Sequence, residues 1–177
     1  PLSGAGMLAM PFAKPALGKL TTVYDDAGLI VEALAVNHPP IDPAVGYRFS
    51  YKGRSLLITG DTTKLDNIQQ FSAGVDLLVH EALAPNLLLM MHEAAEASGN
   101  DILAKIAHDV VDYHTSPVEA AETARDAGVG HLLYYHIVPP LVIPGQKALF
   151  LNGAEDIFPD YTIGEDGVAF SLPAGTD

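Results

Sequence analysis

Four residues that can bind a metal ion or transfer a proton lie close to the ends of predicted strands and helices. They are Asp61, Glu81, His114 and His136. Two carboxylates and two imidazoles, in a chain without cysteine, are donors suited to a divalent ion held by nitrogen and oxygen. Each residue alone also has an ordinary explanation, since an aspartate can form a turn and a histidine can end a helix or pack inside the protein. Only the order and spacing of these residues along the chain can therefore distinguish a functional role from an ordinary structural one.

Short apolar runs that end in polar residues are typical of strands buried on both faces. Such runs cover residues 55–59, 76–79 and 131–135. Helical stretches are predicted between or beside them, at residues 64–71, 87–97, 101–113 and 116–127. In α/β sheets, ligands bind beyond the carboxyl ends of the strands, so Asp61, Glu81 and His136 should meet at one edge. His114, two residues before the last helix, can face the same edge.

The helix at residues 116–127 has the clearest boundaries. Ser116 can cap it, and Pro117 stands at the first helical position. Glu119 completes a capping box with Ser116, and Gly128 can end the helix in a left-handed conformation. This helix should fix the position of His114.

The remaining segments are predicted from turns and alternating patterns. Residues 1–20 and 138–167 read as irregular loops because they are rich in proline and glycine and have no period. Strands are predicted at residues 21–24, 29–35, 47–51 and 168–172. A tight turn at Lys52-Gly53 should join residues 47–51 and 55–59 as a hairpin.

Composition limits the classes of function. A chain of 177 residues with 49% apolar content suits one globular domain. A formal charge of −13 argues against a general nucleic-acid binder, which presents a basic face to phosphates, so nucleic acid is not expected as a partner. The apolar runs are far shorter than the ~20 residues that span a bilayer. A soluble protein of the cytoplasm or periplasm, without a membrane partner, is expected.

Four segments resemble, in order, the C-terminal half of the metallo-β-lactamase fold hydrolases. They are Leu56–Thr62, Leu78–Ala82, His114–Ala121 and Leu133–His136. The similarity is to the branch that contains tRNA 3′-processing endonucleases and arylsulfatase-like enzymes. The resemblance implies an α/β fold of four layers, αββα, of which this chain forms mainly the C-terminal half.

The resemblance also implies a role for each candidate residue. Asp61 is similar to the aspartate that bridges two metal ions, and His136 to the last imidazole ligand of the second ion. Glu81 and His114 resemble a catalytic pair in which the carboxylate orients a histidine that protonates the leaving group. His38 matches a position at the pocket rim, where it would contact the substrate. The implied cofactor is two divalent ions about 3.5–4 Å apart, expected to be Zn²⁺.

The sequence departs from the family in three ways. The His-x-His-x-Asp-His motif, which supplies most metal ligands, is absent from all 177 residues. A further single histidine ligand precedes the bridging aspartate in the family, and only His38 is available. Residues 1–177 are therefore expected to be the C-terminal part of one domain whose N-terminal half is missing. On its own, this chain is expected to be inactive and free of metal. The basic arm of the tRNA enzymes is also replaced by compact strands.

For the complete enzyme the sequence predicts hydrolysis of a small ester, either a phosphodiester or a sulfate ester. Two alternatives stay open: RNA 3′-end processing, and a non-catalytic domain that keeps the fold and binds a partner. An unrelated doubly wound binding domain is disfavoured because no Gly-rich phosphate loop follows any strand. Expected partners are the substrate, the missing half and, as an open alternative, a second copy of the chain.

Overall fold

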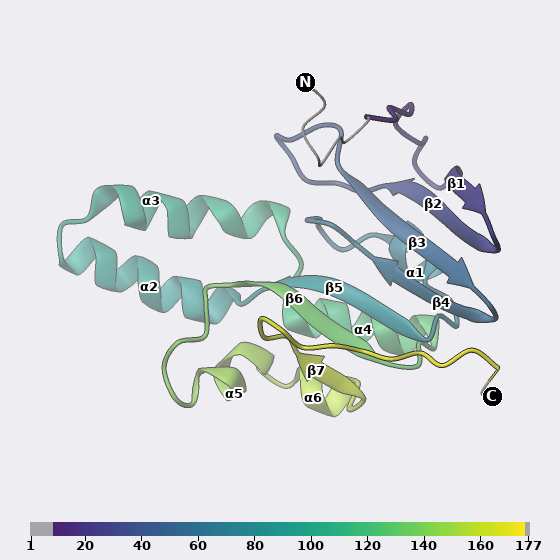
Figure 1. The fold of residues 1–177 in the computed structure, drawn as a ribbon. Coiled ribbons are helices and arrows are strands. Elements are labelled where there is room, and N and C mark those ends of the chain that lie inside the picture. Colours follow the sequence, from purple (N-terminus) through teal and green to yellow (C-terminus); the bar gives the residue numbers. More distant parts are fainter. Residues whose placement is uncertain (1–8, 176–177) are drawn as a thin grey trace, which may run out of the picture.

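The computed structural model describes residues 9–175, and a seven-stranded sheet organises them (Figure 1). The strands are β1 (Leu20–Asp26), β2 (Leu29–Ala35), β3 (Val45–Tyr51), β4 (Arg54–Ile58), β5 (Leu77–Leu83), β6 (Leu132–Val138) and β7 (Tyr161–Ile163). Their order in the sheet follows the chain. The pairs from β1 to β4 are antiparallel, and those from β4 to β7 are parallel. The carboxyl ends of β4, β5 and β6 therefore share one edge.

Helices connect the parallel strands. They are α1 (Asp66–Phe71), α2 (Pro85–Ala97), α3 (Asp101–Asp109) with a 3₁₀ turn (Val110–Tyr113), α4 (Pro117–Ala127), α5 (Gln146–Leu151) and α6 (Ala154–Ile157). Ser116 and Glu119 form the predicted capping box, and Gly128 ends α4 with a φ of 61°. Among residues 9–175, no helix has both the length and the apolar character needed to cross a membrane.

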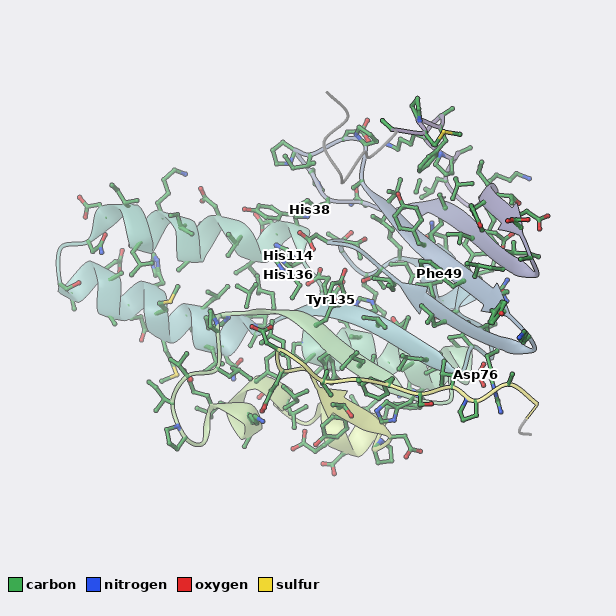
Figure 2. All side chains as sticks on the ribbon, in the orientation of Figure 1. His38, Phe49, Asp76, His114, Tyr135 and His136 are labelled. Atoms are coloured by element: carbon green, nitrogen blue, oxygen red, sulfur yellow. The ribbon has the colours of Figure 1, made fainter. Side chains whose placement is uncertain are left out.

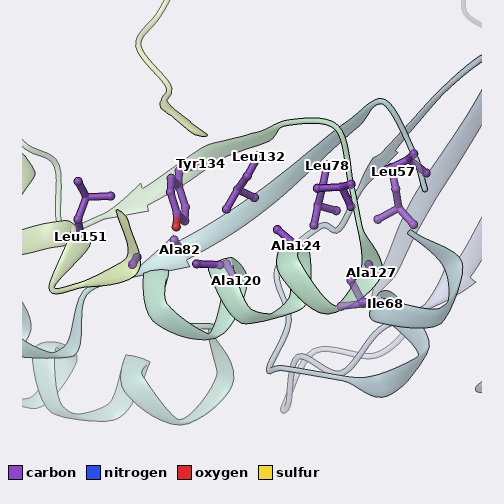
Figure 3. Packing of buried hydrophobic residues seen from close by; sticks show 14 of the residues in the cluster. Leu57, Ile68, Leu78, Ala82, Ala120, Ala124, Ala127, Leu132, Tyr134 and Leu151 are labelled. Atoms are coloured by element: carbon purple, nitrogen blue, oxygen red, sulfur yellow. The ribbon is translucent and has the colours of Figure 1, made fainter. Parts of the chain in front are cut away.

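One face of the sheet is closed by helices. Leu57, Leu78, Leu132 and Tyr134 point from β4, β5 and β6 toward alanines of α4 (Figure 3). The small alanine side chains let the helix approach the strands closely, and these strand residues are fully buried. This layer is the main hydrophobic core of the described residues. A smaller cluster around Leu83 and Leu88 lies at the base of the α2–α3 hairpin, which projects from the sheet (Figure 1).

The opposite face of the sheet is partly open. Val31, Phe49 and Leu56 are aligned across β2, β3 and β4 and are only half-buried. The segment after β7 crosses this side of the sheet (Figure 1), and Arg54 Nε donates to the Pro173 carbonyl at 2.9 Å. The predicted α/β class is confirmed, and the described residues form one sheet covered by helices on one face.

The sequence-based predictions fail mainly after residue 138. The predicted loop at 138–167 contains α5, α6 and β7, and the predicted strand at 168–172 is irregular. Both helices are very short, and burial of Phe150, Leu151 and Ala154 stabilises them rather than any local pattern. Residues 9–19 are irregular as predicted, and the first eight residues of that prediction lie outside the described part of the chain.

Candidate active site

Asp61 is placed by a glycine turn after β4. Gly60 has a φ of 66°, which is readily available to glycine. A Cβ at this position would lie 2.6 Å from the Val45 carbonyl oxygen, so a larger residue would clash with the backbone of the neighbouring segment. The turn places Asp61 at the shared edge of the sheet, with its side chain 37% exposed.

His136 is placed by an irregularity in β6. Glu81 pairs with Tyr135 and Ala82 with Ile137, so His136 is the extra residue of a β-bulge, and its φ is 44°. Bulges re-aim side chains and occur often beside active sites. His136 Nε2 lies 3.4 Å from Asp61 Oδ2. These two predicted metal ligands are therefore brought together.

His38 reaches the same carboxylate from the loop after β2. Its Nδ1 lies 2.9 Å from the Tyr113 carbonyl oxygen. Because a carbonyl only accepts, Nδ1 carries a hydrogen, and in a neutral imidazole the lone pair is then on Nε2. His38 Nε2 lies 4.0 Å from Asp61 Oδ2. The histidine thus lies among the candidate metal ligands.

Glu81 and His114 form a buried pair beside this group. Glu81 Oε1 accepts hydrogen bonds from the backbone N–H groups of Thr62, at 3.1 Å, and Thr115, at 2.9 Å. His114 Nδ1 lies 3.2 Å from the same oxygen, without the alignment of a hydrogen bond. Burial by itself would lower the pKa of His114, but the Glu81 carboxylate, helped by Asp61, outweighs it, so this pKa is raised. A histidine that holds its proton in this way is suited to be a general acid.

Hydroxyl groups that were not among the predicted site residues form hydrogen bonds around Glu81. Thr115 Oγ1 donates to the Thr62 carbonyl at 2.6 Å, and Thr59 Oγ1 accepts from the Glu81 N–H at 3.2 Å. Burial is the main cause that raises the pKa of Tyr135 to about 12, and its hydroxyl contacts Thr59 and Gly60. Tyr135 therefore stays neutral. The polar residues at the ends of β4 and β6 were the available signal for this network.

The candidate residues gather at one end of the sheet. Figure 2 shows His38, His114 and His136 close together, with Tyr135 beside them and Asp76 at the opposite end. Asp76 has a structural role there, since its carboxylate accepts from the Ser55 N–H at 2.7 Å and pairs with Arg54. The bond from Ser55 is the first cause of its lowered pKa.

The donors suit a divalent metal ion but form an incomplete set. Two imidazole nitrogens approach one carboxylate oxygen, and the Nδ1–H of His38 is held by a carbonyl, as is common for metal-binding histidines. Within residues 9–175, however, no group of three or more His, Cys, Asp or Glu side chains is arranged to hold an ion.

The fold and this edge of the sheet define a class of protein. The family model for the β-lactamase superfamily domain matches residues 11–137, and the chain belongs to this family. The chain is 33% identical over 124 residues to ribonuclease Z of Mycobacterium tuberculosis, a match that covers 70% of this chain and 41% of that protein. The predicted family is thus confirmed at the level of the superfamily.

Solved structures show the same fold. The short form of human tRNase Z matches with a TM-score of 0.56 and 22% identity, over 88% of this chain and 47% of that one. The metallo-β-lactamase fold protein YhfI of Bacillus subtilis matches with a TM-score of 0.55 and 19% identity, over 82% of this chain and 49% of that one. The chain spans less than half the length of each of these three relatives.

The comparisons also correct one prediction. The expectation that nucleic acid is not a partner is wrong, because the similar proteins include ribonuclease Z and tRNase Z, whose names denote action on RNA. The expectation rested on the formal charge of −13. That number sums over a chain that spans less than half of these relatives, and it does not describe the charge at one face.

Proposed function

We propose that this chain supplies the bridging-aspartate half of a divalent-metal centre in a hydrolase that cleaves RNA phosphodiesters. The observation that carries the proposal is the meeting of His136 and His38 at one oxygen of Asp61. The buried Glu81–His114 pair lies directly beside them, with the His114 and His136 rings 5.7 Å apart. The similarity to ribonuclease Z favours RNA over a sulfate ester as the substrate.

Three residues would hold the metal ions. Asp61 would bridge them, and His136 and His38 would each present an Nε2 lone pair. His38 is thereby proposed as a ligand, whereas the sequence suggested a substrate contact. Bound divalent ions supply charge that polarises the phosphodiester and neutralises charge developing on its oxygens.

Proton transfer would come from His114. Its raised pKa keeps a proton available, and the Glu81 carboxylate, whose Oε1 lies 3.2 Å from Nδ1, would orient the ring. Glu81 is itself held by the backbone N–H groups of Thr62 and Thr115, so it cannot rotate away without losing two hydrogen bonds. The pair can therefore deliver a proton to the oxygen that leaves the phosphorus.

A second sheet layer would complete the domain. We propose that it packs on the open face around Phe49 and Leu56 and carries the remaining metal ligands. Three facts support this: the half-buried apolar residues of that face, the absence of the His-rich motif from the sequence, and the lengths of the relatives. Residues 1–177 would then be one half of a single domain.

The leaving-group dependence of catalysis tests the proposed function. In the protein completed by its first half, His114→Ala should slow cleavage of a 3′-extended RNA about 10²–10⁴-fold. It should have little effect on bis(p-nitrophenyl) phosphate, whose leaving group needs no proton. His131→Ala, at the other end of β6, is the matched control. An equal loss on both substrates would remove His114 from the role of acid, and no cleavage of either by the completed wild type would refute the function.

A further inference from the structure

A buried hydroxyl group links two segments that carry candidate site residues. Thr115 Oγ1 donates to the Thr62 carbonyl at 2.6 Å, although the two residues are 53 positions apart in the chain. Both residues are 0% exposed. Asp61 directly precedes Thr62, and His114 directly precedes Thr115. The bond therefore ties the backbone beside a proposed metal ligand to the backbone beside the proposed proton donor.

The Glu81 carboxylate closes this link into a ring of three hydrogen bonds. Its Oε1 accepts from the N–H groups of Thr62, at 3.1 Å, and Thr115, at 2.9 Å, while the hydroxyl joins the two threonines directly. Threonine is branched at Cβ, which restricts the χ1 angle that aims this hydroxyl. None of the three residues can shift without breaking or lengthening a bond to another.

The position of the His114 ring depends on how its backbone is held. Its Nδ1 lies 3.2 Å from Glu81 Oε1 without the alignment of a hydrogen bond, so the carboxylate alone does not fix the ring. A general acid has to lie within hydrogen-bond reach of the leaving oxygen. A misplacement of about 1 Å can slow a reaction about 10²-fold. The backbone at His114 therefore has to be fixed relative to Asp61.

We propose that Thr115 is a positioning residue for the proposed reaction. Its hydroxyl keeps His114 in place relative to Asp61, so that the proton reaches the oxygen that leaves the phosphorus. Valine is similar in shape and would bury no polar group, whereas a fully buried hydroxyl is costly unless it is hydrogen-bonded. The inference rests on the proposed function and adds a residue that acts through His114.

Thr115→Val and Thr115→Ser, made in the protein completed by its first half, test the inference. Thr115→Val should lower kcat on a 3′-extended RNA about 10–10²-fold with KM unchanged, since Thr115 does not reach the substrate. It should have little effect on bis(p-nitrophenyl) phosphate. Thr115→Ser keeps the hydroxyl and should restore most of the loss. Thr123→Val is the matched control, because that hydroxyl is also buried and donates to the Glu119 carbonyl inside α4 at 2.9 Å.

A double variant separates positioning from a general structural role. In a protein that already carries His114→Ala, Thr115→Val should cost no further activity, because Thr115 acts through His114. Thr115→Ala leaves room for a water molecule at the Thr62 carbonyl. It should show the same difference between the two substrates, and it replaces Thr115→Val if that variant does not fold.

Three results would overturn the inference. They are an equal loss on both substrates, a further loss in the double variant, or a Thr115→Val variant as active on RNA as wild type. Each of them leaves the proposed function standing. No cleavage of either substrate by the completed wild type would instead refute the proposed function, on which the role of Thr115 rests.

Discussion

Two acid–histidine pairs lie side by side at the same edge of the sheet and differ in how completely the chain builds them. Glu81 and His114 are 0% and 7% exposed, and backbone N–H groups fix the carboxylate. Asp61 and His136 are 37% and 45% exposed. The residues of this chain bury and orient all groups of the proposed proton donor, whereas the proposed metal site would need further ligands.

The two faces of the sheet repeat this contrast. Leu57 and Leu56 are neighbours in β4 and point to opposite sides. Leu57 is fully buried against the helix layer, and Leu56 is half-buried on the open face. The exposed candidate ligands and the open face both support the proposed second layer.

Glu81→Ala should have the largest effect on stability. It leaves the N–H groups of Thr62 and Thr115 buried without their acceptor, so we expect a loss of about 3 kcal/mol or more in the free energy of unfolding. Asp61→Ala should change it by less than about 1 kcal/mol because its side chain is partly exposed. Urea unfolding measures both. Similar losses in the free energy of unfolding for the two variants would contradict the proposed difference between the two pairs.

Leu57→Ala and Leu56→Ala compare the two faces directly. The first removes a fully buried side chain and should cost about 2–4 kcal/mol. The second should cost about 1 kcal/mol in this chain, since half of its environment is open. The cost of Leu56→Ala should rise when a second layer is present. Equal costs in the 177-residue chain would mean that the open face is already covered.

His80 gives a smaller, pH-dependent effect. It is fully buried on β5, and this burial lowers its pKa despite the Glu81 carbonyl, which lies 2.8 Å from Nδ1. In the unfolded chain His80 takes up a proton near pH 6.5, whereas in the folded protein its lowered pKa keeps it neutral to lower pH. The free energy of unfolding therefore falls as the pH drops below about 6.5, by at most about 1.4 kcal/mol per pH unit. His80→Gln should flatten this slope, whereas the exposed His108→Gln should not. An unchanged slope would show that His80 is not the titrating group.

A structural feature could be predicted from the sequence when the interactions that produce it lie close together in the chain. The α4 cap could be predicted because Ser116, Glu119 and Gly128 act within one helix. The β-bulge that orients the His136 side chain depends on the register of β6 against β5. It therefore has no signature in the sequence around His136.

Long-range contacts explain the other failures. The position of His38 depends on a carbonyl 75 residues away, at Tyr113. The short helices α5 and α6 exist because their apolar residues pack on the core, which no short-range signal shows.

Zinc binding by the 177-residue chain tests the central claim most directly. A partial ligand set should bind Zn²⁺ weakly, so that dialysis removes it. Competition titration should show that Asp61→Ala abolishes the remaining binding, while Ser116→Ala leaves it unchanged. Two equivalents of zinc retained after dialysis, with an affinity that Asp61→Ala does not alter, would contradict the assignment of this edge as half of a metal centre.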